Sequence, residues 1–201
     1  MAERQKQIIA ITGYSAVGKS SLARSISEHL DMGLFSLGNH QRAQFGAHGT
    51  PPEYHAKFGL FATYYSQWST YIDEISKNSS GDGVVVESVY SHAFLELMKS
   101  RFPEHSIHLM AISANREDRL RFLRLKADIG PEEAERHLDE LDRIKNTVGL
   151  AALLRRGIAQ LELINNGDLD TFLRKGIEAA KILAQGTIEC QTKSGLLLPT
   201  H

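Results

Sequence analysis

The stretch QIIAITGYSAVGKSSLARSISEHL, residues 7–30, constrains the fold more than any other part of the chain. Its first six residues form a short, mostly apolar and β-branched run, which is typical of a buried parallel strand. A loop with two glycines follows, and Leu22, Ile26 and Leu30 then recur at helical spacing. A strand, a glycine loop and an amphipathic helix in direct succession predict the opening unit of an α/β fold.

The loop itself, GYSAVGKS at residues 13–20, matches the pattern G-x-x-x-x-G-K-[ST]. Its two glycines permit backbone dihedrals that other residues avoid, so that successive amide N–H groups and the following helix N-terminus can face an anion. Lys19 offers positive charge to a transferring phosphoryl group, and the Ser20 hydroxyl offers a ligand to Mg²⁺. We therefore predict a nucleoside triphosphate site whose contacts come from Gly13, Tyr14, Ser15, Ala16, Val17, Gly18, Lys19, Ser20 and Ser21.

Further apolar runs alternate with helical patterns along the chain. We predict strands at 34–37, 84–87, 108–113 and 162–165, with helices at 53–77, 116–126, 132–146 and 168–185 among others. This alternation predicts a three-layer α/β/α domain with a parallel sheet of about five strands. The domain would span 1–185, with a helical acceptor-binding region near 39–77, a short lid near 116–137 and a C-terminal tail at 186–201.

Composition restricts the partners. The chain carries 23 lysines and arginines against 24 acidic residues, and this balance gives no support for a nucleic-acid or membrane partner. The start lacks a long apolar run, so we expect no signal peptide and no membrane span. Cys190 is the only cysteine, which excludes an internal disulfide. We expect a cytoplasmic monomer or homodimer that acts on a small molecule.

A carboxylate near the phosphates would complete a magnesium site. Glu87 ends the apolar run VVVE, and ligands of open parallel sheets bind at the carboxyl ends of the strands. We predict Ser20 and Glu87 as metal ligands, with Glu87 also facing the acceptor. The alternative is a glutamate at a strand end that faces only water.

Several classes of protein share this phosphate loop. The chain lacks the N-K-x-D and D-x-x-G strings of a GTPase, and no second signature of a motor or an AAA-type ATPase is visible. Of the classes that share the loop, small-molecule kinases remain as the predicted class.

Three further segments resemble the nucleoside and nucleotide kinase group of P-loop proteins. FSLGNHQRAQFGAHGTPPEY (35–54) is similar to part of cytidylate and related monophosphate kinases, and SANREDRLRFLRLK (113–126) resembles the segment that opens their lid. Residues 142–173 resemble the end of archaeal adenylate-kinase-related proteins, a phage deoxynucleoside monophosphate kinase and dephospho-CoA kinases. The resemblance implies that Gly38 and Arg42 bind the acceptor and that Arg143 also binds the substrate. It implies that Arg119 and Arg124 close over the phosphates. It further implies that Asn165 and Gly167 wrap the adenine of ATP.

Charge indicates the class of acceptor. A hydroxyl acceptor usually needs a carboxylate as its base, but the second predicted strand, LFSLG, contains no acid. An acceptor phosphate is already anionic and needs positive charge, which Arg42 would supply. We therefore predict Mg²⁺-dependent phosphoryl transfer from ATP to a nucleoside or deoxynucleoside monophosphate. Glu53 or Glu87 acting as a base leaves a hydroxyl acceptor as an alternative.

The sequence departs from the kinases at residues 87–92, ESVYSH, where many relatives have an arginine that contacts the acceptor. Ser88, Tyr90 and His92 would make weaker contacts there. The missing arginine also leaves open a non-catalytic, nucleotide-binding regulator. The aromatic side chains Phe58, Phe61, Tyr65 and Trp68 are predicted as core, and the scattered His40, His48 and His55 do not predict a metal site.

Overall fold

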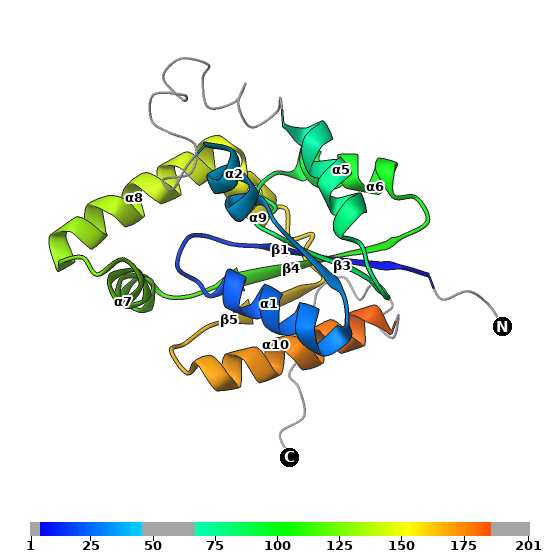
Figure 1. Cartoon of the computed structure of the whole chain (residues 1–201). Helices are drawn as coiled ribbons and strands as arrows, with labels where there is room; N and C mark the ends of the chain where they lie inside the picture. The colour runs from blue at the N-terminus through cyan, green and yellow to red at the C-terminus, as the bar shows by residue number, and fades with distance from the viewer. Residues whose placement is uncertain (1–4, 46–66, 186–201) are drawn as a thin grey trace.

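The computed structural model describes residues 5–45 and 67–185. Within these ranges, parallel strands form one sheet of five in the order β2-β3-β1-β4-β5 (Figure 1). The strands are β1 (Gln7–Thr12), β2 (Gly33–Ser36), β3 (Gly83–Glu87), β4 (Ser106–Ser113) and β5 (Leu161–Ile164). The predicted parallel sheet is therefore confirmed, and β1 lies at its centre between β3 and β4.

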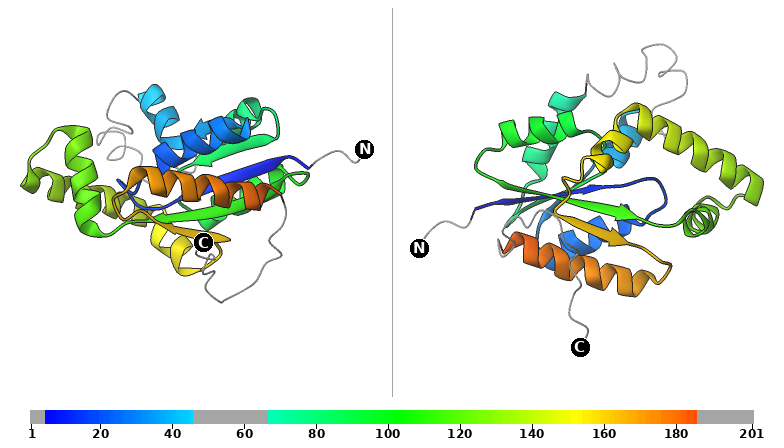
Figure 2. Two further views of the ribbon diagram at one scale, coloured as in Figure 1. Left: turned by 90° about the horizontal axis from the view of Figure 1, so that it is seen from below. Right: turned by 180° about the vertical axis from the view of Figure 1, so that it is seen from behind.

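Helices cover both faces of the sheet. They are α1 (Lys19–Leu30), α2 (Leu37–Phe45), α5 (Trp68–Asn78), α6 (His92–Arg101), α7 (Arg116–Ala127), α8 (Pro131–Thr147), α9 (Leu150–Arg155) and α10 (Leu169–Ala184). Helices α1 and α10 lie on one face, and α5, α6 and α9 lie on the other, while α7 and α8 extend beyond the carboxyl ends of the strands (Figures 1 and 2). None of the helices in the described ranges is long and apolar enough to cross a bilayer.

The central strand explains why the opening run is apolar without interruption. Ile8 and Ala10 of β1 pack into the cluster formed with α5 and α6, and Ile9 and Ile11 pack into the cluster formed with α1 and α10. Successive side chains of a strand point to opposite faces, and both faces are covered here. All six residues of β1 are accordingly buried.

Several predicted boundaries are shifted. β2 ends at Ser36, so Gly38 lies in the first turn of α2 rather than after the strand. The predicted helical continuation after α8 is interrupted at Gly149, whose φ of 110° lies in the left-handed region and separates α9. Trp68 packs against the core as predicted, with its ring 5.6 Å from that of Phe94. The predicted core residues Phe58, Phe61 and Tyr65 lie outside the described residues.

Gly13 holds the junction between β1 and the phosphate loop. Its φ is 140°, and a Cβ at this position would overlap the carbonyl oxygen of Ile112 in β4. We expect Gly13→Ala to lower the free energy of unfolding by about 2 to 4 kcal/mol, because both the dihedral and the close approach exclude a methyl group. Urea denaturation measures the loss. Gly130→Ala is the matched control, since its Cβ would meet nothing within 4 Å, and an equal effect in both variants would contradict the argument.

Candidate active site

The phosphate loop connects β1 to α1 in a conformation that ordinary residues avoid. Ala16 and Gly18 have φ values of 58° and 93°, and Gly18 is the N-cap of α1. Val17 is buried in the core against α1, and this packing anchors the loop to the core. Ser20 and Ser21 are exposed in the first turn of α1. The helix N-terminus and the loop amides therefore lie at the same end of the sheet, as an anion site requires.

Lys19 is the first residue of α1 and is buried. Its ammonium group turns back over the loop and donates a hydrogen bond to the carbonyl oxygen of Tyr14 at 2.5 Å. Burial lowers the pKa of Lys19 to about 8; the nearby Glu87 carboxylate opposes this shift, and the Arg119 guanidinium adds to it. An anion bound in the loop would restore the charged form of Lys19, because opposite charge favours it.

Glu87, at the end of β3, is paired with the start of α1. Ser20 Oγ donates a hydrogen bond to Glu87 Oε1 at 2.6 Å, and Ser36 Oγ donates to Glu87 Oε2 at 2.6 Å. Glu87 is buried, so the alternative of a glutamate that faces only water is wrong. The donor set is made of oxygen atoms only, which suits Mg²⁺. Among the described residues, no cluster of three or more histidine, cysteine or acidic side chains offers a competing metal site.

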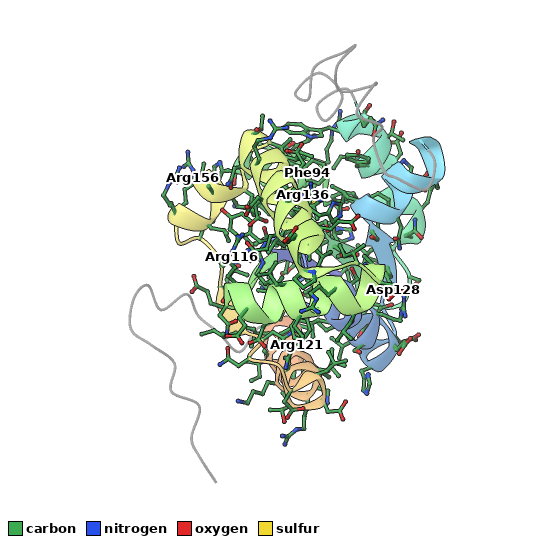
Figure 3. The ribbon with its side chains drawn as sticks, turned by 90° about the vertical axis from the view of Figure 1, so that its left-hand side faces the viewer. Phe94, Arg116, Arg121, Asp128, Arg136 and Arg156 are labelled. Atoms are coloured by element: carbon green, nitrogen blue, oxygen red, sulfur yellow. The ribbon has the colours of Figure 1, made fainter. Side chains whose placement is uncertain are left out.

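Helices α7 and α8, which we call the lid helices because they include the segment near 116–137 predicted as a lid, pack against the phosphate loop. Leu123, Ala134 and Leu138 are buried between the two helices, and Ala16 of the loop packs against them. On the outside, Arg116 pairs with Asp139 at 2.8 Å and with Glu135 at 3.2 Å, which links α7 to α8 (Figure 3). The lid helices therefore lie against the loop in this structure.

Arg119, predicted to act on the phosphates, is buried at the loop. Its Nε donates to the carbonyl oxygen of Ser15 at 2.9 Å, and its Nη2 donates to Asp142 Oδ1 at 2.6 Å. The guanidinium group also lies 5.2 Å from the centre of the Tyr14 ring. Its position is therefore compatible with the predicted role, and Asp142 orients the side chain.

Two other predicted arginines are not brought to the loop. Arg124 is exposed on α7, and Arg143 is exposed on α8, where it forms a two-bond pair with Glu140 at 2.7 and 2.8 Å. Arg143 lies on a different face of α8 from Asp142 and Lys145, which are three positions apart and turn toward the loop. For both arginines, a role in catalysis or substrate binding stays a prediction without a supporting contact.

Asn165 connects the loop after β5 to the phosphate loop. It is buried, and its Nδ2 donates to the carbonyl oxygen of Val17 at 3.2 Å while its Oδ1 accepts from the backbone N–H of Gly167 at 3.3 Å. A Cβ on Gly167 would meet the Arg121 guanidinium, which donates to Asp118 at 2.7 Å. The predicted nucleotide-base loop thus lies beside the phosphate loop, and its contact with adenine stays a prediction.

The acceptor side is described only in part. Gly38 is half-buried in α2, and Arg42 belongs to the same helix, but its side chain lies outside the described part of the structure. After Glu87, Ser88 has a φ of 77°, which is uncommon for a residue other than glycine and is frequent at functional sites. Glu53, the alternative base, also lies outside the described residues.

The C-terminal half of α8 contributes residues that the sequence analysis missed. Lys145 Nζ donates to Ser15 Oγ at 2.7 Å, and the Tyr14 hydroxyl donates to Asn146 Oδ1 at 2.8 Å. Together with Asp142, these residues occupy one face of α8 at helical spacing. That spacing was readable in the sequence, but the direction in which the face points depends on the turn between α7 and α8.

These features define a P-loop fold of the kinase type: a phosphate loop with its lysine, a carboxylate at the end of the adjacent strand and a pair of helices packed against the loop. Residues 9–144 match the family model described as "AAA domain" (AAA_18), and the chain belongs to that family. The sequence analysis predicted against an AAA-type ATPase because no second motif was visible. At the level of the family, that prediction was wrong.

Solved structures share the fold across most of the chain. A shikimate kinase from Bacteroides thetaiotaomicron has a TM-score of 0.60 at 16% identity, covering 89% of this chain and 98% of its own. A gluconokinase from Sinorhizobium meliloti 1021 has 0.55 at 15% identity, covering 92% and 97%. A putative kinase from Chloroflexus aurantiacus J-10-fl has 0.59 at 14% identity, covering 92% and 99%. A search of curated proteins found no match. The structural likenesses establish the P-loop kinase fold.

Proposed function

We propose that this protein is a Mg²⁺-dependent phosphotransferase that moves the γ-phosphoryl group of ATP to a nucleoside or deoxynucleoside monophosphate. The observation that carries the proposal is the convergence of Lys19, Arg119 and the Ser20–Glu87 pair around one phosphate loop. Phosphoryl transfer depends on positioning and on positive charge at the oxygens of the transferring group. The three parts supply both the positioning and the positive charge.

Each part has a defined role in the transfer. The loop amides hold the triphosphate, and Lys19 exchanges the Tyr14 carbonyl for a phosphate oxygen. Ser20 and Glu87 would hold the metal ion, which supplies positive charge to the phosphate oxygens when bound. An oxygen of the acceptor forms a bond to the γ-phosphorus as the bond to the ADP oxygen breaks, and Arg119 stabilises the charge on the group between them.

The carboxylates support a phosphate rather than a hydroxyl acceptor. Among the described residues, Glu87 and Asp142 are the carboxylates whose charge acts on the lysines of the site. Both oxygens of Glu87 accept hydrogen bonds from serines, and Asp142 is paired with Arg119. Neither carboxylate is free to take a proton from an incoming hydroxyl, whereas an acceptor phosphate needs no base.

A hydroxyl acceptor is the second candidate. Two proteins with the same fold are named shikimate kinase and gluconokinase, and these names refer to acceptors that are not nucleotides. The segment 88–91 after β3 also contains no lysine or arginine to bind an acceptor phosphate. In that case Glu87 would act as the base, and Arg42 would not be needed for a phosphate.

A panel of acceptors separates the two candidates. With γ-labelled ATP and Mg²⁺, we expect label in at least one of AMP, CMP, GMP, UMP, dCMP and dTMP, because the site concentrates positive charge. The parallel panel contains nucleosides, shikimate and gluconate, and EDTA should abolish transfer in both. Label found only in the hydroxyl panel would overturn the proposed acceptor class. Binding of ATP without transfer in either panel would instead support a non-catalytic regulator.

A further inference from the structure

Lys145 joins two loops of the site that are far apart in the sequence. Its ammonium group, from α8, donates to Ser15 Oγ of the phosphate loop at 2.7 Å. The same group lies 5.0 Å from the centre of the Tyr90 ring, in the loop that follows Glu87. Lys145 thus brings positive charge from the lid to the position between the phosphate loop and a loop that carries no lysine or arginine of its own.

Charged groups from four elements of the fold act on Lys145. The residue is only partly exposed, and the charged groups acting on its ammonium are Lys19 of α1, Arg119 of α7, Asp142 of α8 and Glu87 of β3. Burial, Lys19 and Arg119 together hold the pKa of Lys145 well below its usual value, although Asp142 and Glu87 oppose them.

Two lysine side chains that act on one another electrostatically, with a guanidinium beside them, are unfavourable in their charged forms without a compensating anion. Like charges disfavour one another in a buried site, and Asp142, one of the two nearby carboxylates, is already paired with Arg119. A structural bond to Ser15 alone would not require a cation, because a neutral amide of similar length could donate it. A phosphoryl group between Lys19 and Lys145 would satisfy both charges.

We propose that Lys145 is a second catalytic lysine, which contacts the phosphoryl group as it passes from ATP to the acceptor. The inference rests on the phosphoryl transfer in the proposed function and does not depend on which acceptor is used. Lys19 holds the group from the donor side, and Lys145 holds it from the lid, next to Tyr90. The charge that segment 88–91 lacks is in this way supplied by α8.

The test compares Lys145→Met with wild type in binding Mg²⁺-ADP, with and without aluminium fluoride, which mimics a phosphoryl group in transfer. Isothermal titration calorimetry requires no acceptor, so its outcome is independent of the acceptor panel. We expect aluminium fluoride to tighten wild-type binding by about a hundredfold and Lys145→Met to lose most of that gain, because one charged donor to the transferring group is removed. Binding of Mg²⁺-ADP alone should change less than about threefold.

Three further variants keep the result interpretable. Lys145→Arg should recover part of the gain, because it restores the charge. Arg136→Met, an exposed cation on the same helix, should behave as wild type (Figure 3). If Ser15→Ala loses as much as Lys145→Met, the lysine only braces the loop, and the proposal is wrong. It is equally overturned if wild type gains nothing from aluminium fluoride, or if Lys145→Met gains as much as wild type.

Discussion

Replacement of Lys19 by methionine should lower kcat for phosphoryl transfer by about a thousandfold, because the charge on the transferring oxygens loses its nearest compensating group. The side chain keeps its length and stays buried, so the loop should fold as before. Steady-state kinetics with γ-labelled ATP measures the loss, and thermal unfolding checks the fold. Lys181→Met is the matched control: this half-exposed lysine pairs with Glu178 on α10, and its replacement should leave kcat unchanged.

The same variant has a pH signature. The pKa of Lys19 is lowered to about 8 in the free protein, and bound phosphates should raise it. Between pH 8 and the higher pKa of the complex, nucleotide binding must therefore take up a proton, and affinity must fall as the pH rises. Titrations of a non-hydrolysable Mg²⁺-ATP analogue from pH 7 to 9.5 should show this fall in wild type and a smaller one in Lys19→Met. Lys145 contributes to the part that remains. Equal slopes in the two proteins would rule out this role for Lys19.

Glu87→Gln should lower kcat by about a hundredfold or more at physiological Mg²⁺ and raise the concentration of Mg²⁺ needed for half-maximal rate. The amide keeps the shape of the carboxylate but not its charge, and one of its two ends can no longer accept a hydrogen bond from Ser20 or Ser36. Activity measured as a function of Mg²⁺ separates weakened metal binding from a direct effect on the acceptor.

Excess Mg²⁺ should recover part of the rate in Glu87→Gln if the carboxylate serves the metal. A loss that no Mg²⁺ concentration reduces, together with an unchanged half-maximal concentration, would favour Glu87 as a base and hence the hydroxyl acceptor. Glu162→Gln, at an exposed position of β5, is the control and should match wild type.

Much of the fold could be predicted because its signals are local. Each strand buried on both faces reads as an apolar run, and the loop of residues 13–20 is a single stretch whose chemistry follows from its own residue types. The Ser20–Glu87 pair was also predictable, since parallel strands end at the same edge of the sheet. The boundary errors at Gly38 and Gly149 concern residues whose conformation depends on their neighbours in space.

The arginines of α7 and α8 show what could not be predicted from the sequence. Arg119, Arg124 and Arg143 were equivalent as cations in helical segments, yet only Arg119 points to the loop, where Asp142 and the Ser15 carbonyl bind it. Arg143 forms a local pair with Glu140, as exposed arginines on helices often do. Residue type could not distinguish them, because the rotation of each helix about its axis is set by packing around Leu123, Ala134 and Leu138.

The sequence by itself determined the sheet, the phosphate loop and the class of ligand that such a loop holds, because those properties depend on residues adjacent in the chain or on strands with a common direction. Only the tertiary structure decided which side chains of the lid meet the loop. Lys145 lies 130 positions from Ser15 along the chain, and no spacing rule connects them. Their contact depends on the turn at residues 128–130, which folds α8 back over the phosphate loop and turns one face of that helix toward it.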